Sequence, residues 1–104
     1  MASIYQNLPF ALPDECVDVL LTHQNVRIER IVSQGHSTPV GEWYDQTENE
    51  WVIVLQGLGV IEYENGKQVT LNTGDYLYLP AHLKHRVAST SVHEKTIWLA
   101  IFWS

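Results

Sequence analysis

The sequence predicts an all-β protein, built as a sandwich or a barrel, and three observations support this class. β-Branched and aromatic residues dominate the 104-residue chain from residue 16 onward. Turn-forming residues separate the apolar runs at short spacing, and no segment shows the 3.6-residue period of a long helix. Hydrophobic residues make up 45% of the chain, so a single domain of this length can bury a core of its own.

The first expected element is a β-hairpin. Its strands cover residues 17–21 and 26–32, and the polar residues His23, Gln24 and Asn25 form the turn between them. A short helix over residues 14–21 is the competing interpretation, because Pro13 and Asp14 could start one. A loop rich in turn residues is then expected over residues 33–41.

Further strands are expected at short intervals after this loop. The first of them is nearly unbroken in its apolar character, which is typical of a strand buried on both faces. Asn65-Gly66 is the strongest two-residue hairpin signal in the chain. In the strand expected at residues 76–79, alternation places Leu77 and Leu79 on one face, and Tyr76 and Tyr78 on the other. The strands are expected at 51–56, 60–64, 68–71, 76–79, 86–89 and 96–103.

Composition limits the partners and the compartment. With a net charge of −6 and only six Lys and Arg residues, the chain has no basic stripe for nucleic acid or an anionic membrane. No run approaches the roughly 20 apolar residues of a membrane helix, and no secretory signal is recognised. The single Cys16 cannot form an internal disulfide, which fits a reducing compartment, so a cytoplasmic location is expected.

Two segments combine metal-capable side chains with turn-forming residues. The first runs from Trp43 through Asp45 and Glu50 to Gly57, with six residues between Glu50 and Gly57. The second has Gly74, five residues, Pro80, and then His82 and His85. Over residues 26–103 these segments resemble the two motifs of the cupin superfamily. The resemblance implies a jelly-roll double-stranded β-helix, the cupin barrel, with a metal or a ligand in its mouth.

The resemblance also sets the expected domain limits. Residues 1–104 form one cupin domain, in which residues 1–25 are an N-terminal extension that contributes a hairpin strand, and residues 26–103 form the barrel.

This sequence matches each motif only in part. Glu50 and Gly57 fit the end of the first motif, while Trp43 and Asp45 occupy its two histidine places. In the second motif, His85 occupies the matching histidine place. A further histidine, His82, stands where a glycine is usual, between Pro80 and His85.

The candidate metal ligands are therefore Asp45, Glu50, His82 and His85. Imidazole suits divalent Mn, Fe, Zn or Ni, and added carboxylates favour the harder ions among them. Each candidate has a simpler alternative. Asp45 could cap a turn, and Glu50 could be a surface carboxylate of a hairpin. His82 could be an exposed loop residue, and His85 could be a residue at the barrel mouth that forms hydrogen bonds without binding a metal.

Trp43 and Tyr44 are the candidate ligand-binding aromatics, with a place in the core or an interface as the alternative. Two functions are compatible with these residues. The first is a metal-dependent enzyme acting on a small polar molecule; the alternative is a non-catalytic barrel that binds or senses a small ligand without metal. A homodimer is also expected, because an uncovered apolar edge strand at residues 97–103 would otherwise favour aggregation.

Overall fold

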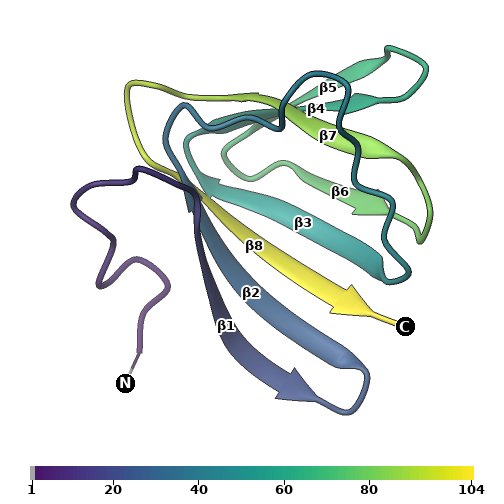
Figure 1. Cartoon of the computed structure of the whole chain (residues 1–104). Coiled ribbons are helices and arrows are strands. Elements are labelled where there is room, and N and C mark those ends of the chain that lie inside the picture. Colours follow the sequence, from purple (N-terminus) through teal and green to yellow (C-terminus); the bar gives the residue numbers. More distant parts are fainter. Residues whose placement is uncertain (1) are drawn as a thin grey trace.

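The computed structural model describes residues 2–104 and confirms the all-β jelly roll, with two antiparallel sheets packed face to face (Figure 1). The five-stranded sheet has the order β1-β2-β8-β3-β6, and the three-stranded sheet has the order β5-β4-β7. The strands are β1 Cys16–His23, β2 Val26–Ser33, β3 Asn49–Gln56, β4 Leu58–Tyr63, β5 Gln68–Asn72, β6 Tyr76–Leu79, β7 His85–Thr90 and β8 Thr96–Trp103.

Both predicted hairpins are present. The interpretation of residues 14–21 as a helix is wrong, because β1 pairs with β2 along its length from Cys16 to His23. The second hairpin turns at Asn65-Gly66, where Gly66 has a φ of 89° and its N–H donates to the carbonyl of Tyr63. Across residues 2–104, no helix is long and apolar enough to cross a membrane.

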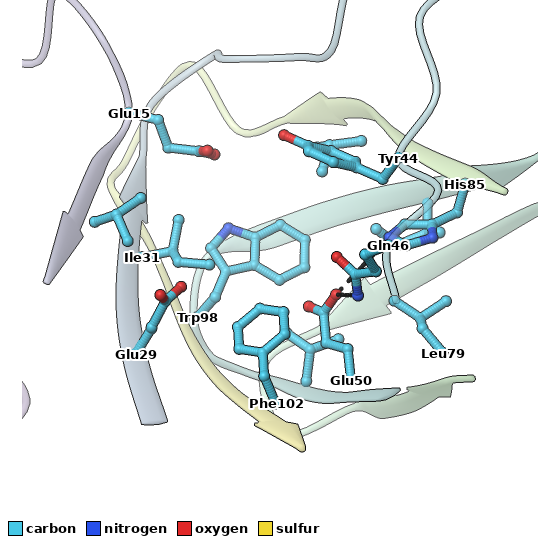
Figure 2. A pocket seen from close by; sticks show the side chains of 14 residues that line it. Glu15, Glu29, Ile31, Tyr44, Gln46, Glu50, Leu79, His85, Trp98 and Phe102 are labelled. Atoms are coloured by element: carbon cyan, nitrogen blue, oxygen red, sulfur yellow. Dashed lines mark hydrogen bonds and ion pairs between the residues drawn. The ribbon is translucent and has the colours of Figure 1, made fainter. Parts of the chain in front are cut away.

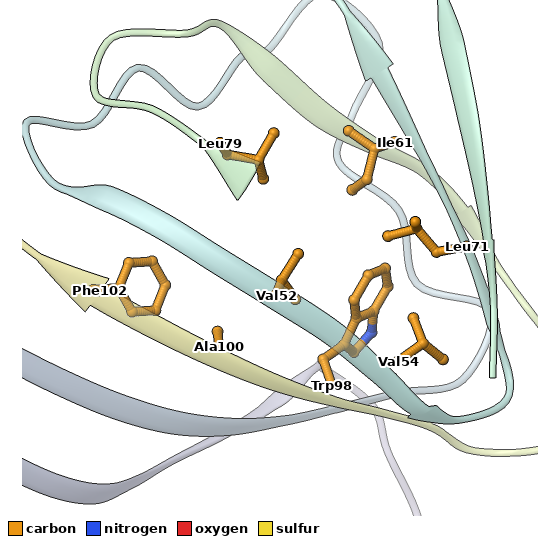
Figure 3. Close-up of a cluster of buried hydrophobic side chains, with 8 residues drawn as sticks. All are labelled: Val52, Val54, Ile61, Leu71, Leu79, Trp98, Ala100 and Phe102. Atoms are coloured by element: carbon orange, nitrogen blue, oxygen red, sulfur yellow. The ribbon is translucent and has the colours of Figure 1, made fainter. Parts of the chain in front are cut away.

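The space between the inner faces of the two sheets holds a cavity (Figure 2) and, beside it, the hydrophobic core (Figure 3). Alternation along the strands directs every second side chain inward. Since several core side chains also line the cavity, the packing that stabilises the barrel also shapes its interior. The core consists of Val52, Val54, Ile61, Leu71, Leu79, Trp98, Ala100 and Phe102.

Two glycines allow close contacts between segments of the barrel. A Cβ atom on Gly59 of β4 would overlap the indole ring of Trp98, so only glycine allows this ring to lie against the strand. Gly57 has a φ of 88°, and a Cβ there would lie 2.5 Å from the Thr96 hydroxyl oxygen. The glycine that closes the first motif is therefore required both by its backbone conformation and by the space around it.

The loop between β2 and β3 covers the outer edge of β7. Gly35 N–H donates to the Ser91 carbonyl at 2.8 Å, and Thr38 N–H donates to the Val87 carbonyl at 2.8 Å. Further along the loop, Tyr44 forms an isolated antiparallel bridge with His85. These bonds satisfy backbone groups that an edge strand would otherwise expose, and they fix residues 44–46 against the cavity.

The expectation of an uncovered final strand is wrong, because β8 lies inside the five-stranded sheet between β2 and β3. Exposed apolar side chains lie instead on the edge strand β1 and on the outer face of this sheet. Trp51 and Tyr76 lie with ring centroids 5.4 Å apart, and Tyr78 stacks on Trp103 at 5.9 Å. More than half of each of Tyr76 and Tyr78 remains exposed.

The homodimer stays a prediction, and we expect its interface to lie on this aromatic outer face. In light scattering at micromolar concentration, we expect a mass twice the 11.9 kDa of one chain. The double variant Tyr76→Glu/Tyr78→Glu should shift the protein to the monomer, because charges are unfavourable in a buried apolar interface. Val40→Glu, on an exposed loop residue, serves as the matched control. A monomeric wild-type protein would contradict the prediction.

Candidate functional site

The cavity between the sheets has a volume of about 210 Å³. An engineered cavity of roughly 150 Å³ is large enough to hold benzene, so this one accommodates a small organic molecule. Its wall is apolar and aromatic in the middle, with polar groups towards its two ends (Figure 2). The polar lining residues are Glu15, Glu29, Tyr44, Gln46, Glu50 and His85, and the others are Val17, Ile31, Val52, Ile61, Leu79, Val87, Trp98 and Phe102.

Glu50 and His85 face each other at one end of the cavity. Glu50 lies on the inner side of β3 and is only 8% exposed, while His85 begins β7 and is only 4% exposed. The His85 Nε2 atom lies 3.8 Å from the Glu50 Oε1 atom, which is beyond hydrogen-bond distance. Gln46 Nε2 donates to the same Glu50 oxygen at 3.0 Å.

The other ring nitrogen of His85 fixes its tautomer. Nδ1 lies 2.9 Å from the carbonyl oxygen of Leu83, and a carbonyl can only accept, so Nδ1 carries the proton. In a neutral His85, Nε2 is therefore an acceptor that faces the Glu50 carboxylate. Two facing acceptors need a donor between them, which can be a proton on either group, a donor group of a ligand, or a cation.

Burial raises the pKa of the Glu50 carboxyl, because the charged form loses hydration inside the barrel. The Gln46 hydrogen bond and the nearby His85 act in the opposite direction without cancelling this effect. Glu50 is thus a proton acceptor whose affinity for the proton exceeds that of an ordinary surface glutamate.

Tyr44 forms the wall above the Glu50–His85 pair. Its backbone N–H donates to the His85 carbonyl at 2.8 Å, and the His85 N–H donates to the Tyr44 carbonyl at 3.2 Å. The two rings lie 5.5 Å apart. Burial, followed by the negative charge of Glu15, raises the pKa of the Tyr44 phenol, so the group stays protonated and can donate to a ligand.

The opposite end of the cavity carries Glu15 and Glu29 (Figure 2). Glu15 accepts a 2.6 Å hydrogen bond from the Ser33 hydroxyl. Glu29 lies on β2 and pairs with Arg27 at 2.8 Å. The site is therefore bordered by carboxylates at both ends.

The structure separates the four predicted metal ligands into two pairs. Glu50 and His85 line the cavity, whereas Asp45 and His82 form an exposed pair, with Oδ1 and Nδ1 2.9 Å apart, and neither lines it. Within the described residues, no three His, Cys, Asp or Glu side chains come together in a way that could hold a metal ion.

The backbone of His82 explains why glycine is usual at its position. His82 has a φ of 64°, in the left-handed region that glycine adopts without strain. Its N–H donates to the Gln46 carbonyl at 2.8 Å and so joins the two loops at the mouth of the barrel. The position is constrained by this connection, and a site role for the His82 side chain is not needed to account for it.

The predicted ligand-binding aromatics also separate. Tyr44 lines the cavity, as expected for a binding residue, whereas Trp43 lines only a second, more open hollow of about 430 Å³, which shares Tyr44 with the cavity. Alternation explains the difference, because successive residues of an extended segment point to opposite sides. Here Tyr44 faces inward, while Trp43 and Asp45 do not line the cavity.

Sequence reasoning missed several cavity residues. Trp98 and Phe102 face inward with Ala100 by simple alternation along β8, so periodicity could have identified them. Glu15 and Glu29 carry no comparable signal, because nothing in the local sequence distinguishes a carboxylate at the end of a cavity from one on the surface.

Comparison with known proteins agrees with this architecture. The sequence profile of the family described as "Cupin domain" matches residues 29–102, which is most of the chain. The chain belongs to the cupin family. A comparison with curated proteins finds no significant match.

This cupin is similar to several solved structures. One is a protein of Ralstonia eutropha JMP134 named as a candidate mannose-6-phosphate isomerase, with 39% identity, a TM-score of 0.95 and coverage of 100% of this chain and 97% of that one. A cupin superfamily protein of Desulfitobacterium hafniense DCB-2 has 20% identity and a TM-score of 0.75, covering 92% of this chain and 83% of that one. A protein of Thermus thermophilus, at 11% identity, has a TM-score of 0.81, and the match covers 99% of this chain and 95% of that one. The last two support the fold alone.

The burial of Glu50 predicts a pH-dependent stability difference in metal-free protein. Its pKa is raised above the ordinary 4.5, so ionisation favours the unfolded state. Stability is therefore lost as the pH rises from the ordinary pKa through the raised one, by about 1.4 kcal/mol per pH unit within that window. Glu50→Gln removes this loss, so the variant should be more stable than wild type at pH 7 and nearly equal at pH 4.

Chemical denaturation across this pH range measures the difference between the two proteins. Glu94→Gln, at an exposed position, provides the control and should follow the wild-type curve. A Glu50→Gln variant that is less stable than wild type at pH 7 would show that the carboxylate is stabilised by its surroundings, contrary to the argument from burial.

Proposed function

We propose that this cupin binds a small polar organic molecule in the cavity between its sheets, with Glu50 and His85 as the polar pair that contacts it. The observation that carries the proposal is that these two buried groups face each other at 3.8 Å without a hydrogen bond between them. Burying polar groups that lack full partners lowers stability, and such groups are concentrated where a protein binds or reacts.

The surroundings support binding by a preformed site. Backbone hydrogen bonds fix Tyr44 against His85, and Gln46 orients Glu50. Trp98 and Phe102 supply apolar contact area between the polar ends. A ligand can thus satisfy polar groups at an end of the cavity while it packs against aromatic rings in the middle.

NMR of the tryptophan indole N–H groups tests the proposal. In a screen of small polar molecules, binding compounds should shift the Trp98 signal and leave Trp51 and Trp103, on the outer face, unchanged. Binding should weaken about tenfold or more in His85→Ala, because one hydrogen bond in a buried site is worth about 1.4 kcal/mol. The control His93→Ala changes an exposed residue. A library in which no compound shifts Trp98 would contradict the proposal.

A metal-dependent enzyme is the second candidate, and the Glu50–His85 pair is the observation that favours it. An isomerase moves a proton and needs an acceptor and a donor near the substrate, and this pair could serve in that role. The fit to a metal is incomplete, however. Catalytic zinc sites generally have three protein ligands, and this pair offers two. A bound Mn, Fe, Zn or Ni ion would polarise a substrate oxygen, but Glu50 and His85 alone would hold it weakly.

Elemental analysis of protein purified without a metal-affinity tag separates the two candidates. We expect much less than one transition-metal ion per chain in the wild type. Near-stoichiometric metal that persists in His82→Ala and disappears in His85→Ala would favour the metal-dependent enzyme instead.

A cytoplasmic location remains part of the proposal, supported by the single free Cys16.

A further inference from the structure

We propose that the ligand of this cavity is a small organic cation, a protonated or quaternary amine that also carries a hydrogen-bond acceptor. The inference rests on the proposed function, since it assigns a chemical class to the ligand of the same cavity. It also argues against a phosphorylated sugar, the substrate class that the name of the Ralstonia eutropha protein suggests.

The charges around the cavity are the first argument. Glu15, Glu29 and Glu50 contribute three carboxylates from three separate segments, and no Lys or Arg in the described chain lines the cavity. Three of the basic residues pair with carboxylates elsewhere, in Arg30–Asp18, Lys84–Glu64 and Arg86–Glu62. Neither Lys67 nor Lys95 lines the cavity.

The nearest basic group is already engaged. Arg27 lies over the Phe102 ring at 4.4 Å, but its guanidinium pairs with Glu29 at 2.8 Å and with Glu48 at 2.9 Å. Arg27 therefore compensates Glu29 and a carboxylate outside the cavity. Among the charged groups facing the ligand space, Glu15 has only the Ser33 hydroxyl as partner, and Glu50 has Gln46 with His85 nearby.

The aromatic walls are the second argument. Tyr44, Trp98 and Phe102 line the cavity between the carboxylates. The faces of aromatic rings attract cations, and more so when the cation is removed from water. A cation in the middle of the cavity would contact aromatic rings while lying between Glu15 and Glu50, which stand at opposite ends (Figure 2).

Two hydrogen-bonding features complete the argument. A protonated amine has N–H donors, and a quaternary amino alcohol has an O–H donor, and either suits the facing acceptors Glu50 and neutral His85. Trp98 is only 4% exposed, and its Nε1–H is the one fully buried side-chain polar group in the described residues that has no hydrogen-bond partner. Its nitrogen points towards the end of the cavity that carries Glu15 (Figure 2). Because this nitrogen is itself buried, the indole ring would have to shift slightly to reach the cavity. An acceptor on the ligand would then supply the hydrogen-bond partner that it lacks.

A phosphate group fits this cavity poorly. Phosphate is usually bound by Arg, Lys, or backbone N–H groups at a helix N-terminus, and the described residues place none of these in the cavity wall. A phosphate dianion would instead face carboxylates. A neutral ligand would meet no such repulsion, and comparison of a cation with its uncharged isostere therefore tests the preference for a positive charge.

Calorimetric titration at 0.15 M salt provides this comparison. The probes are a panel of small alkylammonium alcohols including choline, the uncharged isostere of each (3,3-dimethylbutan-1-ol for choline), and mannose 6-phosphate. We expect at least one cation to bind ten times or more tightly than its isostere, and mannose 6-phosphate to show no binding. Glu15→Gln should weaken the cation about three- to tenfold, because it removes one uncompensated charge. The control Glu94→Gln changes the net charge equally on an exposed loop and should have no effect.

Several outcomes would overturn the inference. It is wrong if every isostere binds as tightly as its cation, if mannose 6-phosphate binds and displaces the cation, or if no cation in the panel binds. It is also wrong if Glu94→Gln weakens the cation as much as Glu15→Gln does, since the effect would then be one of net charge. If only neutral or anionic compounds shift Trp98 in the indole NMR screen and no cation does, the proposed function stands while the charge assignment fails.

Discussion

The backbone bridge between Tyr44 and His85 is the contact on which the site depends. Its two hydrogen bonds attach the loop after β2 to the first residue of β7, and so connect the two motif segments at the mouth of the barrel. The bridge places the Tyr44 ring over the cavity and holds His85 in line with Glu50. Without it, the first residue of β7 would lose its backbone partner and the polar end of the cavity would lose its wall.

The cavity contains groups whose burial stabilises the fold and groups whose burial destabilises it. Aromatic and aliphatic side chains stabilise the barrel by burial, while Glu50 and the Trp98 indole N–H lose hydration there without full compensation. A barrel selected only for stability would replace these groups with apolar ones. Their presence agrees with the proposed function, in which a bound ligand would supply the partners that the protein itself does not.

The fold could be predicted well from the sequence, because alternation and turn chemistry are local signals. Asn65-Gly66 identified a hairpin, and the apolar run at 51–56 identified an interior strand, without any knowledge of tertiary structure. The neighbours of β8 could not be predicted in this way. Its apolar character suggested an exposed edge, but only the pairing order shows that both of its sides are occupied.

The candidate site was predictable only where the spacing of the motif agrees with the direction of the side chains. Glu50 and His85 satisfy both conditions. Asp45 occupies a ligand place in the motif, but in this chain the inward side chain of that segment belongs to its neighbour Tyr44. Likewise, His82 stands where the backbone requires a left-handed conformation, and its ring remains in solvent. Replacement of two motif histidines therefore coincides with a cavity that has aromatic walls and few metal ligands.

The central position of β8 has a consequence for how the chain folds. β2 pairs with β8 along its whole length, from Val26 opposite Trp103 to Ser33 opposite Thr96, so partners from nearly opposite ends of the barrel sequence must meet. The β1–β2 hairpin can form early, but it joins the rest of its sheet only through residues 96–103. Proteins dominated by such distant pairings fold slowly, on the scale of milliseconds to seconds. The cavity can therefore take shape only once residues 96–103 have paired with both β2 and β3. Until then the inward apolar side chains of these strands lack their cover, and such transiently exposed surface favours aggregation.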